Sequence, residues 1–297
     1  MKLSVDCIFC LIERLYRFIK IVDLGYNEVK IIFKYIVDNI GEKPLYEIHY
    51  GSLKLINLFD SKKKLLSLRR RIFLMTKKLY DIALSITSSI RSMGIEDVLS
   101  RTIILSILVD DPWFFIESKT DNIDYTKLSS ILSNPAPPGL EVLKVIDYMP
   151  SGSSLAYFPG SLASLWVDKL FITMLAEKNI DVNVYIYNDL IGFQQSLGDL
   201  KDALMETSLV YHVLNKPADI SFELFKAIRD NDLILIRNPI GIDCIIEKLE
   251  ELKDIALANK IILVFRWKCP VVENILGYVH GKYFVISTDL LISKLFL

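Results

Sequence analysis

Apolar residues in the first third of the chain recur at intervals of three and four positions, the spacing of one face of an α-helix. Leu11, Leu15 and Ile19 begin this pattern, and glycines interrupt it at intervals. The pattern predicts helices over residues 5–22, 27–40, 46–58, 62–93 and 95–108, of which the fourth is long enough to be broken into two. We expect residues 1–135 to form a helical domain.

After residue 149 the pattern changes to short β-branched or aromatic runs that alternate with helical stretches, which is typical of βαβ units. Strands are expected at residues 154–158, 182–187, 209–213, 233–237, 261–266 and 283–287. Helices are expected at residues 161–178, 196–207, 221–229, 241–257 and 270–276. We therefore predict an α/β domain over residues 136–297, with a doubly wound, mostly parallel sheet in a Rossmann-like three-layer α/β/α arrangement.

Composition places the chain among globular proteins of the cytoplasm. Its 297 residues are 52% apolar and carry a net charge of -1, so charge balance argues for neither a nucleic-acid nor a membrane partner. No apolar run approaches the roughly 18 residues of a membrane helix, and Asp6, Glu13 and Arg14 interrupt any signal peptide. Glutamine occurs only at Gln194 and Gln195, which fits a thermophilic source.

The cysteines are too few for a disulfide scaffold in a chain of this length. Cys7 and Cys10 share one face of the first predicted helix, which suits either core packing or half of a metal site. Core packing is the preferred interpretation, because buried cysteine behaves as a small hydrophobic residue.

The carboxyl ends of the strands are where ligands bind in sheets of this kind. After the first predicted strand, Gly160 and Ser161 form a strand-turn-helix with small residues, where a backbone can approach a phosphate. The segment is neither Gly-x-Gly-x-x-Gly nor a P-loop. Ser161 lacks the flanking glycines of a nucleophile elbow, so we interpret it as a helix N-cap.

The segment IILVFRWKCPVVENILGYVHGKYFVIS at residues 261–287 reads as a strand, a basic turn, a short helix, a loop and a strand. It resembles the end of the metal-dependent damage-control phosphatases, long known as domain of unknown function 89. The Asp-Lys-Leu of that family matches Asp168 to Leu170, and the Cys-x-x-Cys at the start is similar to its archaeal members. The other matching positions are Lys268, Cys269, Val272, Leu276, Gly277, Gly281 and Val285.

The resemblance implies a hydrolase with a divalent cation, but the cation-binding positions are rewritten. The family carries Gly-Asp-Asn-x-Gly-Glu after the first strand, and its cation-binding Asp and Asn fall on Gly160 and Ser161. A second element, Leu-Asn-Asp, falls on Gly192-Phe193-Gln194 without a gap. With a gap it falls on Asn188 and Asp189, which would leave a relic of the metal site.

Two basic residues keep their place in the resemblance. Arg237 takes the position of the lysine in the family's Lys-Gly-Gln-Gly-Asn element, and Lys268 matches its phosphate-contacting lysine. The resemblance therefore implies a phosphate-binding corner formed by Arg237, Lys268, Gly160 and Ser161.

Magnesium and manganese need carboxylate ligands, and the aligned positions supply none. Our leading hypothesis is that the chain has lost its metal site, holds no cofactor and is a non-catalytic binding or regulatory protein for a phosphorylated small molecule or a protein partner. One alternative is an active phosphatase with a shifted site at Asp189, Asp110 and Asp111 that holds manganese, cobalt, nickel or magnesium. Another is a structural subunit of a complex.

One basic cluster stands out in this nearly neutral chain: residues 62–64 are all lysine and residues 69–71 all arginine. It lies on a predicted helix without interleaved aromatic residues of the kind that stack on bases. A solvated helix surface is the default interpretation, and a contact with a phosphate backbone or a partner protein is the alternative.

Overall fold

The computed structural model describes residues 5–92, 94, 96–110, 126, 130, 132–134, 139–187, 193–203, 209–215, 217–238, 242, 244–245, 248, 251, 261–265, 284–290 and 293. Within them, helices precede a sheet, as the hydrophobic pattern predicts. The first six helices are α1 (Val5–Val22), α2 (Tyr26–Asn39), α3 (Leu45–Phe59), α4 (Lys64–Thr76), α5 (Lys78–Ser92) and α6 (Val98–Val109), and α9 (Leu140–Asp147) follows before the first strand.

The sheet has six strands in the order β3-β2-β1-β4-β5-β6. All neighbours are parallel except β5 and β6, which are antiparallel. The chain winds from β1 outward to β3 and then returns to β4 on the other side of β1, so the winding reverses between β1 and β4. The strands are β1 (Ser154–Phe158), β2 (Asp181–Tyr187), β3 (Val210–Leu214), β4 (Leu233–Ile236), β5 (Ile261–Phe265) and β6 (Phe284–Ser287).

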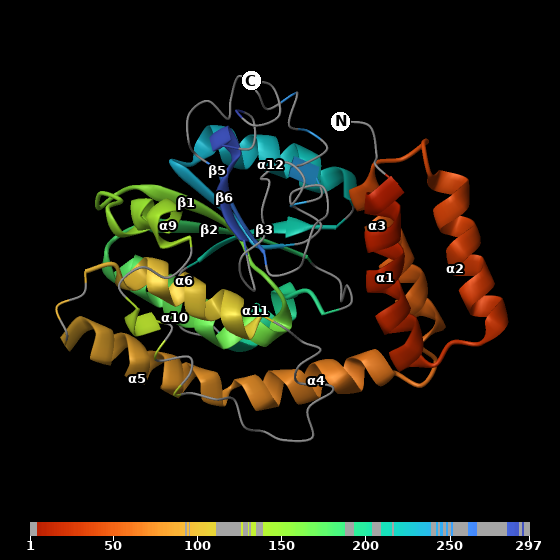
Figure 1. Cartoon of the computed structure of the whole chain (residues 1–297), viewed down its shortest axis with the longest axis horizontal. Coiled ribbons are helices and arrows are strands. Elements are labelled where there is room, and N and C mark those ends of the chain that lie inside the picture. Colours follow the sequence, from red (N-terminus) through yellow and green to blue (C-terminus); the bar gives the residue numbers. More distant parts are fainter. Residues whose placement is uncertain are drawn as a thin grey trace.

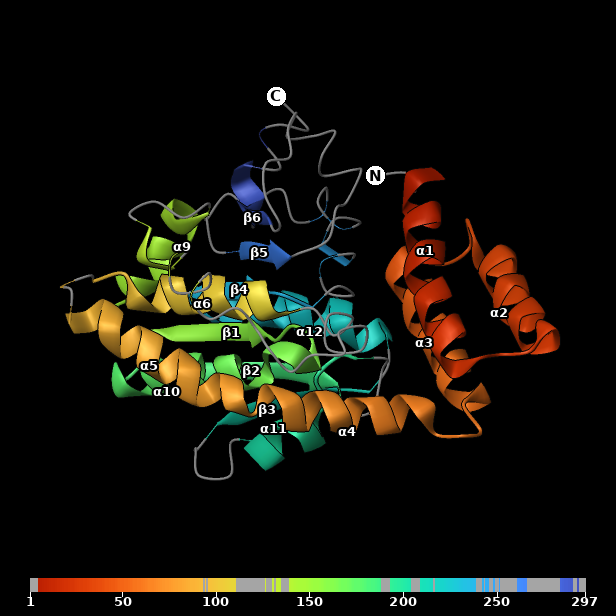
Figure 2. The same ribbon diagram turned by 60° about the horizontal axis from the view of Figure 1, so that its bottom comes forward.

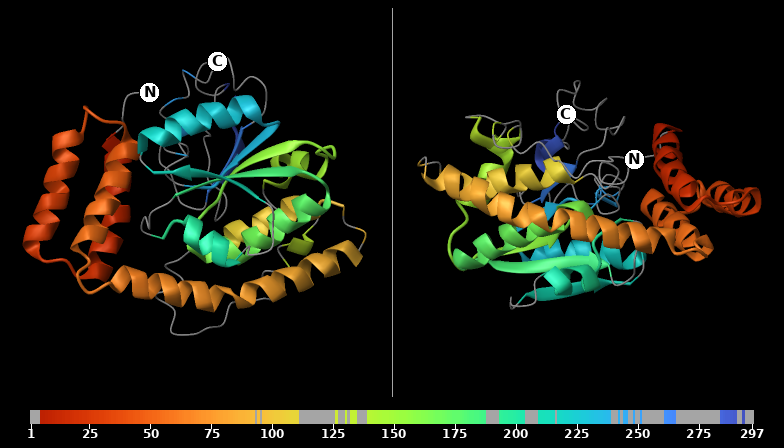
Figure 3. Two further views of the ribbon diagram at one scale, coloured as in Figure 1. Left: turned by 180° about the vertical axis from the view of Figure 1, so that it is seen from behind. Right: turned by 90° about the horizontal axis from the view of Figure 1, so that it is seen from below.

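Helices cover both faces of this sheet. On one face lies α12 (Pro217–Asp230), and on the other lie α6, α10 (Leu165–Glu177) and α11 (Leu197–Ala203) (Figure 1). Outside α6 and α10, α4 and α5 follow one another along an edge of the molecule (Figure 2). The helices α1, α2 and α3 project to one side of the sheet (Figure 3). The predicted three-layer arrangement is confirmed.

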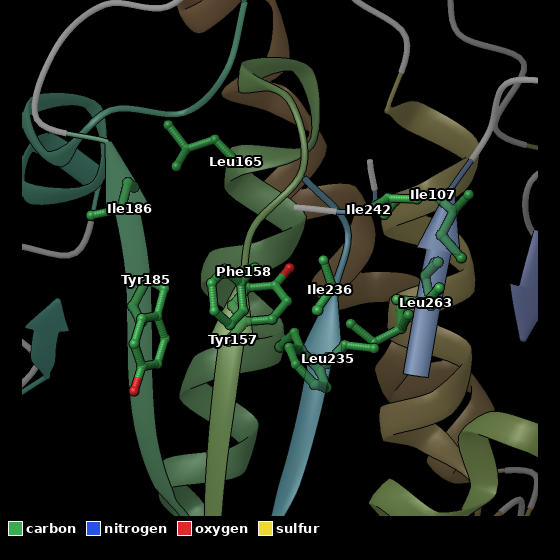
Figure 4. Close-up of a cluster of buried hydrophobic side chains, with 14 of the residues drawn as sticks. Ile107, Tyr157, Phe158, Leu165, Tyr185, Ile186, Leu235, Ile236, Ile242 and Leu263 are labelled. Atoms are coloured by element: carbon green, nitrogen blue, oxygen red, sulfur yellow. The ribbon is translucent and has the colours of Figure 1, made fainter. Parts of the chain in front are cut away.

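The core of the sheet consists of side chains from neighbouring strands (Figure 4). Phe158 on β1 stacks on Tyr185 of β2 with ring centroids 4.5 Å apart, and Tyr185 stacks in turn on His212 of β3 at 4.4 Å. Leu235 and Leu263 continue the core into β4 and β5, and both are fully buried. Burial of such side chains on both faces explains the apolar runs by which the strands were predicted.

The predicted helix over residues 62–93 is divided at Lys77. Lys77 itself keeps right-handed helical dihedral angles (φ −55°, ψ −38°), and the two halves follow one another in a shallow arc (Figure 1). The helix expected at residues 221–229 begins earlier, at Pro217, where proline is tolerated because a first-turn N–H has no helical partner. The helix expected at residues 270–276 and most of the one at 241–257 lie outside the described residues.

Cys10 and Cys244 are free thiols, and Cys244 is buried. Where the structure describes a helix, none is long and apolar enough to cross a membrane.

Candidate functional site at the ends of β1 and β4

Three segments meet where the winding of the sheet reverses. The backbone N–H of Arg237 donates to the carbonyl of Phe158 at 2.9 Å, which aligns the residues that follow β4 with those that follow β1. Gly160 and Ser161 lie just beyond β1, and Asp110 reaches them from the end of α6. The strand-end rule predicted a site at Gly160 and Ser161, the family resemblance added Arg237, and the structure brings the three together.

Arg237 is the centre of this site, and its side chain is fully buried. Nη1 donates to Ser106 Oγ at 2.6 Å and to Tyr157 Oη at 2.9 Å, and it forms an ion pair with Asp168 Oδ1. Nη2 donates to Asp110 Oδ2 at 2.9 Å. Both terminal nitrogens of the guanidinium thus have acceptors inside the protein.

Asp168 is the second buried charge, and its surroundings fully satisfy it. Ser106 donates to Oδ1, while Gln195 Nε2 donates to Oδ2 at 2.6 Å and Ser164 Oγ lies 3.0 Å from the same oxygen. Removing one partner of such a buried pair leaves an uncompensated charge, which costs about 3–5 kcal/mol. Asp168 and Arg237 therefore depend on each other, and neither can be removed alone without leaving a buried charge unpaired.

Asp110 lies at the rim of the site, with its side chain 14% exposed. Oδ1 accepts from the Ser161 N–H at 2.8 Å, and Oδ2 accepts from Arg237. Its backbone N–H donates to Ile107 O at 3.1 Å, so the residue also ends α6. The carboxylate lies where an anion would contact the turn after β1.

Burial raises the pKa of Asp110 above its ordinary value, although Arg237 and the Ser161 hydrogen bond act in the opposite direction. Burial likewise raises the pKa of Tyr157 well above its ordinary value. For Arg237, burial alone would lower the pKa, but Asp168, Tyr157 and Asp110 together raise it. Arg237 is therefore a permanent cation, and Tyr157 stays a neutral phenol.

Gly160 is the residue that lets Asp110 and Arg237 approach the turn. A Cβ atom at this position would lie 3.0 Å from Asp110 Cγ and 2.9 Å from Arg237 Nη2, and it would overlap Asp110 Oδ2. An aspartate, which the family has at this position, would therefore collide with both side chains.

The amides of residues 161–164, which follow Gly160, have internal partners. Ser161 Oγ accepts from Ala163 N at 3.2 Å, which confirms the predicted N-cap, and Ser164 N donates to Ser161 O at 3.1 Å. Leu162 N donates to Phe193 O at 2.8 Å. With Ser161 N bound to Asp110, the amides of residues 161–164 all have internal partners and are not free to receive a phosphate.

Phe193 and its neighbour replace the second ligand element of the ungapped alignment. Phe193 is 2% exposed and packs against Phe18 of α1 with ring centroids 5.2 Å apart. The carbonyl of Gln194 accepts from Arg69 at 2.9 Å, while Gln195 donates to Asp168. These positions contribute to packing and internal hydrogen bonding.

The structure brings four of the predicted site residues together: Gly160, Ser161, Arg237 and Asp110. The other four, Asp111, Asn188, Asp189 and Lys268, lie outside the described residues.

Sequence reasoning missed the roles of Ser106, Tyr157 and Gln195. A signal for Asp168 existed, because it is an aspartate within the apolar run of α10, and a buried charge needs a partner.

The residues at this site do not fit a divalent cation. The resemblance aligns a metal-binding aspartate with residue 160, but this residue is a glycine and has no side chain. The positive charge next to it is the guanidinium of Arg237. Across the described part of the chain, no group of three His, Cys, Asp or Glu side chains is arranged to hold a metal ion.

Comparison with known proteins gives a fold relationship. No family model matches the sequence, and no curated protein matches it. Among solved structures, a DUF89 family protein from Pyrococcus horikoshii is similar, with a TM-score of 0.72 and 15% sequence identity. The match covers 97% of this chain and 99% of the other. The chain has the fold of a DUF89 family protein.

The match spans the helical N-terminal part and the sheet together, so both belong to the shared fold. This confirms the fold that the sequence resemblance implied. At 15% identity it shows architecture alone, and chemistry has to be argued from the residues at the strand ends.

Proposed function

We propose that this chain is a divergent member of the DUF89 family that has lost metal-dependent hydrolysis and acts as a non-catalytic binding or regulatory protein. The observation that carries the proposal is the buried guanidinium of Arg237, which Asp168, Asp110 and Tyr157 hold at the ends of β1 and β4. It supplies a fixed positive charge close to the place where the resemblance puts a divalent cation.

Electrostatics supports this proposal. Two unit charges of the same sign at 4 Å repel each other by about 4 kcal/mol at an effective dielectric constant near 20, and a divalent ion doubles that figure. Asp168 already gives its two oxygens to Arg237, Ser106 and Gln195. A metal ion here would have to displace the guanidinium or compete with it for these carboxylates.

The same contacts change what Arg237 can bind. A phosphate could reach its terminal nitrogens only by displacing Asp110 or Asp168, each of which accepts a charge-assisted hydrogen bond. We therefore propose that Arg237 acts as a structural cation, and that a phosphorylated small molecule would depend on Lys268. Binding through a protein or surface partner is compatible with this arrangement.

One observation favours the alternative of an active enzyme with a shifted cation site. Asp110, Asp168 and Arg237 together carry one negative charge in excess, and burial has raised the pKa of Asp110, so this carboxylate would gain from a nearby cation. The alternative requires Asp189 to converge with one or both of Asp110 and Asp111.

A metal titration separates these two functions. Thermal stability is measured with manganese, cobalt, nickel and magnesium, and hydrolysis of p-nitrophenyl phosphate is assayed in parallel. We expect neither a metal-dependent stabilisation nor turnover. Stabilisation by RT ln(1 + [L]/Kd) together with turnover, both abolished in Asp189→Ala and retained in the exposed control Glu141→Ala, would establish the active enzyme instead.

A further inference from the structure

The distribution of charge along α4 and the start of α5 is far from even. Residues 61–80 contain eight lysines and arginines and no acidic residue, in a chain whose net charge is -1. The nearly neutral net charge of the chain therefore does not reflect this strongly basic segment.

Part of this charge has partners within the chain. Arg69 is buried and forms an ion pair with Asp199, and Lys64 pairs with Asp23 at 3.4 Å. Lys77 lies over the ring of Trp166, 5.9 Å from its centroid.

Five cations of this segment remain, and all are exposed. Within the described part of the chain none of them has a carboxylate partner: Lys62 and Lys63 in the turn before α4, Arg70 and Arg71 on α4, and Lys78 at the start of α5. We call this surface the α4–α5 ridge.

Exposed leucines lie among these cations. Leu66 is 48% exposed and Leu74 58% exposed, and they flank Arg70 at intervals of four residues, so all three lie on one side of α4. Leu84 continues this side into α5 with 44% exposure. The helices form a shallow outward arc at the edge of the described structure (Figures 1 and 3).

We propose that the α4–α5 ridge is a peripheral docking surface for an anionic lipid bilayer. The cations match the negative charge of the headgroups, and clusters of basic residues on an amphipathic helix are the usual means of such binding. The leucines between them would enter the apolar boundary beneath the headgroups.

A nucleic-acid backbone explains fewer of these features. It would use the cations, but the exposed leucines would gain nothing from phosphates, and the ridge offers no aromatic side chain among its exposed residues on which a base could stack. The combination of charge and apolar side chains therefore favours lipid.

The test is sedimentation of the full chain with vesicles of phosphatidylcholine alone or mixed with phosphatidylglycerol. We expect binding to the mixed vesicles only, with an affinity that falls as salt is added. Each juxtamembrane cation contributes about fivefold in affinity, so Arg70→Gln/Arg71→Gln should weaken binding roughly 30-fold.

Two further variants make the result specific. Lys20→Gln/Lys30→Gln removes two exposed cations from α1 and α2 and should bind nearly as well as the unmodified chain. Leu66→Ser/Leu74→Ser keeps every charge and should still lose most of the binding. Thermal melting checks that each variant is folded.

Several outcomes would overturn the proposal. These are no binding to the mixed vesicles, equal loss in the Lys20/Lys30 control, or full binding by the leucine variant. Tight binding of duplex DNA together with weak binding of vesicles would assign the ridge to nucleic acid.

Discussion

At the scale of single residues, the packing at the end of β1 depends on Gly160, which has no side chain. Gly160 leaves the space into which Asp110 and Arg237 extend, and both contacts of Asp110 depend on that space. The position that the resemblance aligns with a metal ligand is therefore occupied by packing contacts in this structure. The cost of filling the space beside Gly160 can be measured as a change in the unfolding free energy, because alanine adds a single methyl group there.

We expect Gly160→Ala to destabilise the protein by about 1–3 kcal/mol, the usual cost of overpacking a filled site. In an Asp110→Ala background the overlapping carboxylate is gone, so the same change should cost less. Urea denaturation of the two single variants and the double variant measures this coupling. An equal cost in both backgrounds would show that Asp110 does not occupy the space.

The raised pKa of Asp110 predicts a pH dependence with a definite sign. A carboxyl whose pKa in the folded state exceeds its ordinary value of 3.8 stabilises the fold at pH below that value, and this contribution is lost as pH rises through the folded-state pKa. The unfolding free energy of the unmodified chain, relative to Asp110→Asn, should therefore fall as pH rises above 3.8. A rise over this window would mean that Arg237 outweighs burial.

Part of this site follows from sequence reasoning and part does not. Gly160 follows from the rule that ligands bind at the carboxyl ends of parallel strands, and Arg237 follows from the family resemblance. The pairing of Asp110 with Arg237 joins residues 127 positions apart, and no local pattern encodes it. Tyr157 was predicted only as part of a strand. Its role as an acceptor for Arg237 was not predicted, because that role depends on which strand lies beside β1.

At the scale of elements, the joint between α9 and α6 shows how one helix completes another. Asp97, the N-cap of α6, gives its carboxylate to Arg101 and makes no side-chain cap bond. Asp147 at the end of α9 instead accepts from Leu99 N at 2.8 Å and from Ser100 N at 3.1 Å. The first turn of α6 is thus capped from outside the helix.

We expect Asp147→Ala to lower the unfolding free energy by about 1–2 kcal/mol, because the first-turn amides of α6 lose their acceptor. Glu141→Ala on the same helix is the matched control, since Glu141 forms an exposed pair with Lys144 and should change stability by less than about 0.5 kcal/mol. Chemical denaturation of both variants measures the difference. Similar values for the two would contradict the capping role.

The elements were predictable because hydrophobic periodicity is a local property. The bounds of α1 and β1 agree with their predicted residues, and the other described strands agree within one residue at each end. The division at Lys77 was not locatable, because helical periodicity runs through it without glycine or proline.

At the scale of the whole molecule, aromatic side chains connect the projecting helices to the strand ends. Phe18 of α1 packs on Phe193, and Tyr50 of α3 lies 6.0 Å from Tyr187 of β2 between ring centroids. Tyr50 Oη also donates to Asn215 O at 3.0 Å. The residues after the strand ends, where a ligand would bind in a sheet of this kind, therefore pack against α1 and α3.

Phe193 is the sharpest probe of this attachment. We expect Phe193→Ala to destabilise the protein by about 3–5 kcal/mol, the cost of removing a buried aromatic ring. Phe222→Ala on α12 is the control, because Phe222 is 69% exposed and its loss should cost less than about 0.5 kcal/mol.

Hydrogen exchange distinguishes a loosened attachment from general destabilisation. In Phe193→Ala, amides of α1 should exchange faster relative to those of β1, because α1 loses a contact that the centre of the sheet does not share. Equal acceleration in α1 and β1 would show that the two parts unfold as one unit. Selective acceleration in α1 would show that the position aligned with a metal ligand now attaches the N-terminal helices to the sheet.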